Sequence, residues 1–189
     1  MAADLREDIL ASAYACVARQ GLARTTVEEV ARQAGVSRAT VYRYFPGGRT
    51  QLQRDVVAWE AGRFMQRLAA ATEGAGDLEH LLAAAVVFGH RAVADHQVLQ
   101  MMLATEPAAL LTQLGLSGGA LVDILRAWLE PHVTPEALAP GVSLDAAVEY
   151  LARMLLSLLS AEGQWDLTDR AQVTALVRTQ MLAGILASP

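Results

Sequence analysis

Arg38 to Tyr44 are seven consecutive residues rich in groups that can bind nucleic acid. They comprise two arginines, two tyrosines, a threonine and small apolar residues, with no acid among them. An arginine guanidinium group can pair with the O6 and N7 atoms of guanine, and hydroxyl groups can reach phosphate oxygens. An acid at such a surface would be repelled by the phosphates. The composition of the stretch therefore predicts contact with the major groove of double-stranded DNA.

A short helix would turn these groups outward. Val36, Val41 and Phe45 provide its apolar face. Ser37 stands where the N-cap of this helix is expected. The free backbone N–H groups at the helix N-terminus suit a phosphate oxygen, and Pro46 ends the helix. The residues left on the outer face are Arg38, Ala39, Thr40, Tyr42, Arg43 and Tyr44.

A second short helix is expected just before this one. Thr25 and Thr26 are each followed three residues later by a glutamate, Glu28 and Glu29, which is the spacing of a capping box. We therefore expect two overlapping capping boxes and a helix that continues to about Ala34. Catalysis by the paired glutamates is the less favoured interpretation.

Gly35 separates the two predicted helices. Glycine permits the left-handed backbone that a tight turn needs. Ala31 is small at the point where the helices would cross. Two short helices packed at a steep angle across a glycine turn form a helix-turn-helix.

The segment from Thr26 to Phe45 matches the pattern T-x-x-x-[IV]-A-x-x-[AS]-G-V-S-x-x-[TS]-[LVI]-Y-x-[HY]-F with the correct spacing throughout. On this pattern, residues 5–55 resemble the DNA-binding domain of the TetR family of bacterial regulators. The resemblance implies phosphate contacts by Thr26, Thr40, Tyr42 and Tyr44. It implies base-edge contacts by Arg38, Ala39 and Arg43.

The segment from Pro46 to Thr50 departs from the family pattern. The family usually continues with a small polar residue and Lys-Glu at the start of a long helix. Here the corresponding stretch is one residue longer and contains no lysine. Arg49 is expected to replace the lysine that contacts phosphate.

The rest of the chain also predicts helices, because apolar residues recur at helical spacing and period-two alternation is absent. The expected fold class is all-α, with about nine helices. A helix over roughly residues 5–20 completes a three-helix N-terminal domain with the helix-turn-helix, and the others cover roughly residues 49–72, 78–95, 97–105, 108–114, 118–132, 144–163 and 169–187. We expect a DNA-binding domain over residues 1–48 and an effector-binding and dimerisation domain over residues 49–189.

The TetR resemblance implies that the C-terminal helices bind a small-molecule effector and form a homodimer. Candidate pocket residues are methionines, aromatic residues and one histidine: Phe88, His90, Met101, Met102, Trp128, Met154 and Trp165. Candidate interface residues follow the apolar stripes of the last two helices: Leu151, Leu155, Leu158, Val173, Val177, Met181 and Gly184. For each pocket residue, burial in the chain's own core is the alternative.

Charge divides the chain unequally. Residues 1–54 carry eight arginines and five acids, whereas residues 55–189 carry seven arginines and fifteen acids, within a net charge of −5. This asymmetry favours nucleic-acid binding by the N-terminal part. The single cysteine, the unpaired histidines and the lack of an apolar run of about 18 residues predict no metal site, no cofactor and no membrane span. The N-terminus is too charged to be a signal peptide, so we expect a cytoplasmic protein. Because it would bind DNA, we expect it to be associated with the nucleoid.

These observations predict a DNA-binding transcriptional regulator. We expect a repressor that a small hydrophobic effector releases from a palindromic operator, because two recognition helices about one DNA turn apart read a palindrome. An effector-independent DNA-binding dimer and an activator remain open as alternatives. An enzyme with an accessory helix-turn-helix is disfavoured, because the sequence lacks a nucleophile elbow, a P-loop and a dinucleotide fingerprint. No catalytic residue is expected.

Overall fold

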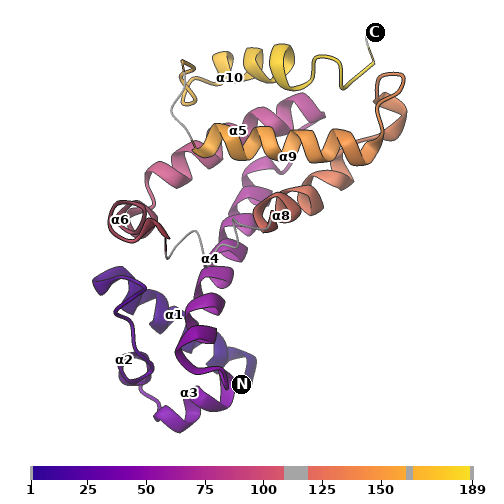
Figure 1. Cartoon of the computed structure of the whole chain (residues 1–189). Coiled ribbons are helices and arrows are strands. Elements are labelled where there is room, and N and C mark those ends of the chain that lie inside the picture. Colours follow the sequence, from indigo (N-terminus) through magenta and orange to yellow (C-terminus); the bar gives the residue numbers. More distant parts are fainter. Residues whose placement is uncertain (1, 109–118, 161–163, 188–189) are drawn as a thin grey trace. The chain divides into compact units, whose positions relative to one another are not determined.

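The computed structural model describes residues 2–108, 119–160 and 164–187 (Figure 1). This part of the chain holds nine α-helices and no β-strand, which confirms the predicted all-α class. The helix predicted over residues 108–114 falls almost entirely outside the described residues. Within the described ranges, no helix has both the length and the apolar character needed to cross a membrane.

The described residues form two compact units. The first combines the described residues of Met1–Met65 and His96–Gly118, and the second combines those of Gln66–Asp95 and Gly119–Pro189. The sequence predicted a boundary after residue 48, whereas the first compact unit continues along the chain to Met65. Leu52 lies beyond residue 48 and is nevertheless buried in the core of the first unit, because its helix packs against the preceding three.

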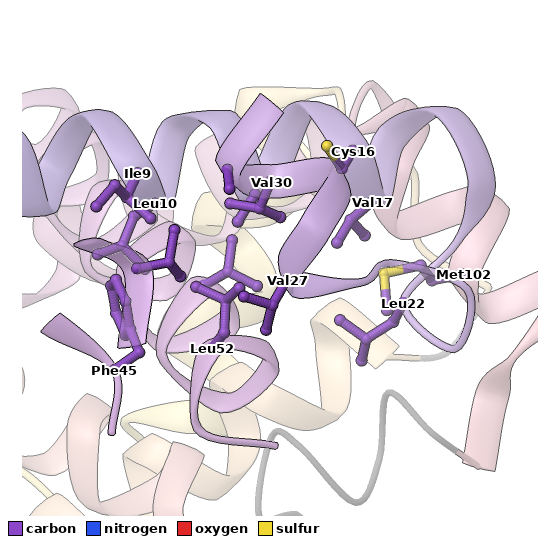
Figure 2. Close-up of a cluster of buried hydrophobic side chains, with 14 residues drawn as sticks. Ile9, Leu10, Cys16, Val17, Leu22, Val27, Val30, Phe45, Leu52 and Met102 are labelled. Carbon is purple, nitrogen blue, oxygen red and sulfur yellow. The ribbon is translucent and has the colours of Figure 1, made fainter. Parts of the chain in front are cut away.

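Four consecutive helices build most of the first unit. They are α1 (Ala2–Gln20), α2 (Val27–Gln33), α3 (Arg38–Tyr44) and the first part of α4 (Gly48–Thr72). Figure 2 shows their apolar side chains gathered in one core, which includes Ile9, Leu10, Cys16, Val17, Val27, Val30, Phe45 and Leu52. Burying a large apolar side chain such as Phe45 stabilises the fold by roughly 1.5–3 kcal/mol. This core holds α3 by its inner face.

Helix α6 (Gln97–Thr105) belongs to the first unit as well. Met102 is buried in the core with Leu22 (Figure 2). Met101 is partly buried and packs against the same cluster. Met102 thus lies in the chain's own core, the alternative to an effector pocket that the sequence left open, and Met101 is half-buried beside it. Periodicity identifies the apolar face of α6 but cannot show which distant helices cover that face.

The second unit contains the end of α4 and four further helices. They are α5 (Leu78–Ala94), α8 (Ala120–Leu129), α9 (Leu144–Ser160) and α10 (Arg170–Leu176). The carboxylate of Asp77 accepts the His80 backbone N–H at 2.8 Å and so caps α5. Fully buried side chains from all four helices form the core, among them Leu82, Val86, Leu129, Leu151 and Leu176.

The last helix ends earlier than predicted. After α10 a single π-helical turn covers Val177–Met181, and Gly184 has a left-handed backbone with φ of +78°. Residues beyond this glycine are extended: the Ala187 N–H donates to the Ala137 carbonyl and the Ala139 N–H to the Ile185 carbonyl, each at 2.9 Å. The predicted helix to residue 187 is wrong: the helical backbone ends at Met181, Leu182 is its C-cap, and Gly184 lies in the turn that follows.

Most of the predicted dimer interface lies inside the chain's own core. The buried members are Leu151, Leu155, Val173, Val177 and Met181, none of which is more than 2% exposed. They already pack within the second unit and are not available to a second subunit. Leu158 is half-buried and Gly184 is exposed, so only these two remain candidates for an interface.

Candidate nucleic-acid interface

Thr26 fixes the start of α2. Its hydroxyl accepts the Glu29 backbone N–H at 3.3 Å, and a Glu29 carboxylate oxygen accepts the Thr26 backbone N–H at 3.0 Å. This is one of the two predicted capping boxes. The other does not form, because Thr25 is buried and its hydroxyl donates to the Gly21 carbonyl at 2.9 Å.

Glu29 also ties α2 to the end of α1. The Gln20 side-chain amide donates to the same carboxylate at 2.8 Å. The hydrogen bond from the Thr26 hydroxyl, and then the one from Gln20, hold the pKa of Glu29 below its usual value. The carboxylate is thus kept ionised and fixes the entry into the helix-turn-helix.

The turn between α2 and α3 depends on Gly35. Its φ is +67°, a left-handed conformation that glycine adopts without strain. The turn closes with a hydrogen bond from the Val36 N–H to the Ala31 carbonyl at 3.0 Å. Ser37 then caps α3 by accepting the Thr40 N–H at 3.1 Å. The geometry is that of a helix-turn-helix, with both caps supplied by hydroxyl groups.

The structure turns the predicted contact residues of α3 to one surface. Val41 and Phe45 are fully buried, so the opposite side of the helix is free. The helix carries no acid, and six of its residues and its cap are exposed or half-buried: Ser37, Arg38, Ala39, Thr40, Tyr42, Arg43 and Tyr44. Tyr42 is 42% exposed, so its ring and hydroxyl are accessible from solvent on this surface.

Two arginines of this surface have defined neighbours. The Arg38 guanidinium group lies 2.6 Å from the Glu28 carboxylate of α2. The Arg43 guanidinium group lies 5.3 Å from the centre of the Tyr44 ring, within cation–π distance. Sequence reasoning assigned Glu28 only to helix capping. No local sequence signal marked this contact, because Glu28 and Arg38 lie on different helices.

Arg49 follows the turn after α3. Its guanidinium group donates a hydrogen bond to the Ala23 carbonyl in the loop between α1 and α2. The side chain is exposed, but this bond already occupies part of it. Gly48 starts α4 with φ of +61°, and a Cβ there would lie 3.2 Å from the Tyr42 ring. Glycine at position 48 thus allows the backbone at the start of α4 to pass close to the Tyr42 ring.

The predicted effector-pocket residues are not gathered in one place. Phe88 lines a groove along α5 in the second unit. Trp128 instead packs against His132, with ring centres 5.7 Å apart. His90, Met154 and Trp165 are half-buried and lie outside this groove. Two groove residues that sequence reasoning missed are Arg91 and Arg170, which carry no motif.

Comparisons with known proteins agree with this geometry. The family model described as bacterial regulatory proteins, tetR family, matches residues 9–53, which include α2, the turn and α3. Over 180 residues the chain is 32% identical to an uncharacterized HTH-type transcriptional regulator of Mycobacterium bovis. That match covers 95% of this chain and 91% of the relative.

Two solved structures share the fold of the whole chain. The TetR family repressor AlkX of Dietzia sp., implicated in biodegradation of n-alkanes, is similar with a TM-score of 0.63 at 17% identity, covering 94% of this chain and 95% of AlkX. The transcriptional regulator FadR of Bacillus subtilis, in complex with stearoyl-CoA, is similar with a TM-score of 0.55 at 19% identity, covering 95% and 98%. The chain belongs to the TetR family of bacterial regulators and is a transcriptional regulator with a DNA-binding helix-turn-helix.

Proposed function

We propose that the protein is a homodimeric repressor that binds a palindromic operator through α3 and is released by a small hydrophobic effector. The outer face of α3 carries this proposal, because Arg38, Tyr42 and Arg43 are exposed there and the helix holds no acid. Arginines on such a face can read guanine, and neighbouring hydroxyl groups can bind phosphate.

The names of two similar proteins support the finer points. AlkX is described as a repressor, and FadR of Bacillus subtilis is described in complex with stearoyl-CoA, a ligand with a long apolar chain. The second unit of this chain has the corresponding fold. Repression and release by an apolar molecule are therefore the functions that we assign to it.

The dimer is proposed to form through the outer faces of α9 and α10. Tyr150 of α9 is 37% exposed, and its hydroxyl donates to the Gln180 carbonyl at 2.9 Å, which links α9 to the π-helical turn after α10. Met154 and Leu158 are half-buried on α9. A two-fold contact through these residues would pair like surfaces and bring two copies of α3 to one DNA duplex.

Footprinting on DNA from around the gene, with a salt titration, tests the proposal. We expect a protected palindrome whose affinity falls steeply with salt, because phosphate contacts release counterions. Arg43→Ala should remove the protection. Arg54→Ala serves as the matched control, because Arg54 is an exposed arginine of α4 outside the helix-turn-helix. Absence of any protected site, including after a genome-wide selection, would refute the proposal.

An effector screen separates the repressor from its alternatives. A ligand that binds the folded protein raises its melting temperature, and an effector must also weaken operator binding. A dimer that occupies DNA but responds to no apolar ligand would be effector-independent. A reporter whose transcription rises when the protein occupies the operator would identify an activator.

A further inference from the structure

A groove of about 390 Å³ runs along α5 in the second unit. Its apolar lining consists of Ala71, Ala84, Val87, Phe88 and Ala92. The volume lies near the lower end of the roughly 300–1,000 Å³ that is usual for ligand pockets. A ligand that fills it would therefore be small and partly apolar.

The sequence of α5 explains why the groove exists. Ala84, Phe88 and Ala92 follow one another at intervals of four residues, so they share one face of the helix. Alanine has no side chain beyond Cβ, and two alanines on this face leave space that larger residues would fill. Phe88 lies between them and forms the widest apolar surface of the groove.

Two arginines line the same groove. Arg91 comes from α5 and Arg170 from the first turn of α10. The Arg91 guanidinium group donates to the Thr168 carbonyl at 3.3 Å. Thr168 is only two residues from Arg170, which begins α10, so this bond holds the Arg91 guanidinium group near the start of that helix. The groove thus has two cationic lining residues.

Arg91 and Arg170 differ from three other arginines of the second unit, which form ion pairs with glutamates. That unit has six arginines and twelve acids in its sequence. Arg126 and Arg153 pair with Glu149, and Arg178 pairs with Glu79.

Arg91 and Arg170 form no ion pair with any acid in the described part of the chain, although the unit has an excess of acids. Asp95 also lines the groove, one helical turn beyond Arg91. The groove therefore carries two positive charges and one negative charge. A carboxylate is the simplest complement, because guanidinium groups bind carboxylates through charge-assisted hydrogen bonds.

We propose that the α5 groove binds an aliphatic carboxylate, with the carboxylate between Arg91 and Arg170 and the chain against Phe88 and the alanines. The regulatory meaning of this site rests on the proposed function, because the ligand would then be the effector. Binding itself does not depend on DNA. Asp95 weakens the site for anions and so orients the carboxylate toward the start of α10.

Isothermal titration calorimetry of the full chain with decanoate, 1-decanol and decylamine tests the proposal. The three probes share one chain length and differ in the charge of the head group. We expect decanoate to bind once per chain and more tightly than the alcohol, and decylamine to bind most weakly. Equal binding of decanoate and decanol, or preference for the amine, would overturn the assignment, as would no binding of decanoate.

Four variants locate the bound carboxylate. Arg170→Gln and Arg91→Gln should each weaken decanoate binding by about tenfold or more, the effect of losing a charge-assisted hydrogen bond. Asp95→Asn should strengthen it. Arg153→Gln is the matched control, because it removes an exposed arginine of the same unit outside the groove. If all four variants bind decanoate like the wild type, the ligand occupies another site and the proposal fails.

Cavity filling provides a test that leaves the charges unchanged. Ala92→Leu should place a larger side chain in the groove and reduce decanoate binding without altering the arginines. Circular dichroism confirms that the variant is folded.

If decanoate binds in the groove but leaves operator footprints unchanged, the site stands and the proposed effector release fails. If decanoate does not bind while the footprint persists, the site fails and the DNA-binding function stands.

Discussion

Arg38 of the recognition helix is held by Glu28 of the preceding helix, with 2.6 Å between the guanidinium nitrogen and the carboxylate oxygen. Both side chains are more than half exposed, so the pair contributes little to stability. Its consequence lies in orientation. Arg38 is a candidate for reading a base edge, and a carboxylate on one side of its guanidinium group limits the directions in which the remaining N–H groups point.

Glu28→Gln should therefore alter specificity more than stability. Removing the charge relieves repulsion between the carboxylate and DNA phosphates, so binding to unrelated DNA should become tighter. The freed Arg38 should discriminate less well at its base, where a good bidentate pair contributes about 1–3 kcal/mol. Competition binding with operator and scrambled DNA should show a smaller ratio of specific to non-specific affinity.

Glu73→Gln provides the control for charge alone, because Glu73 is an exposed glutamate of the second unit. It should leave the specificity ratio unchanged. Arg38→Ala should reduce the ratio in either background, and adding Glu28→Gln to it should change the ratio no further. An unchanged ratio in Glu28→Gln would show that Glu28 does not position Arg38.

Gly21 is expected to be intolerant of substitution for two separate reasons. Its φ is +85°, and a Cβ there would overlap a carboxylate oxygen of Glu106, which would have to move. That carboxylate accepts the Ala23 N–H at 3.0 Å and links the end of α6 to the loop after α1. Gly21→Ala should lower the free energy of unfolding by more than the roughly 1–2 kcal/mol of a left-handed backbone.

Gly74→Ala isolates the backbone cost, because Gly74 has a similar φ of +77° and nothing within 4 Å of an added Cβ. Chemical denaturation should give a larger loss for Gly21→Ala than for Gly74→Ala. Adding Glu106→Ala to each variant should reduce the loss only for Gly21→Ala. Equal losses at both glycines would exclude a contribution from the Glu106 contact.

The helix-turn-helix could be predicted in detail because its signals are local. The Thr26 cap, the Gly35 turn and the Ser37 cap each depend on residues within five positions of one another. The outer face of α3 follows from the two apolar residues of its inner face. Arg38–Glu28 pairing was missed, because capping offered a sufficient local reason for a glutamate at that position.

The C-terminal predictions failed where they depended on distant partners. An apolar stripe on α9 or α10 looks the same whether it meets a neighbouring helix or a second subunit, and Leu151 and Met181 turned out to meet the former. Met102 likewise lies in the chain's own core. Gly184 lies just beyond the end of the last helical turn, whereas the apolar stripe predicted it as an interface residue within a helix to residue 187.

The capping box predicts a pH dependence for the stability of the first unit. The pKa of Glu29 is lowered in the folded state by the Thr26 hydroxyl and by Gln20. A lowered folded-state pKa stabilises the protein fully above the unfolded value of about 4.5. This stabilisation is lost as the pH falls through the lower, folded value. Denaturation curves between pH 7 and pH 3 should therefore show less loss of stability for Glu29→Gln than for the wild type.

Glu7→Gln is the control for this titration, because Glu7 is exposed on α1 and makes no hydrogen bond with the described residues through its side chain. Its denaturation curves should follow those of the wild type across the pH range. If Glu29→Gln loses stability on acidification as steeply as the wild type, other carboxylates account for the dependence.

Two helical glycines should respond to alanine in opposite ways. Gly62 is exposed on α4 with nothing within 4 Å of an added Cβ, so Gly62→Ala should stabilise the protein by about 0.5–1 kcal/mol through the lower backbone entropy of the unfolded chain. Gly89 is buried on α5, and a Cβ there would lie 2.6 Å from a Leu159 methyl group of α9. Gly89→Ala should be destabilising, because overpacking a core costs about 1–3 kcal/mol.

Leu159→Ala tests whether this contact is the cause. In that background the alanine at position 89 has room, so the penalty of Gly89→Ala should shrink or reverse, whereas the gain from Gly62→Ala should be unchanged. A double-mutant cycle measured by chemical denaturation gives the coupling between positions 89 and 159 directly. A coupling near zero would mean that Leu159 moves aside without cost, and close packing of α5 against α9 would then not require glycine.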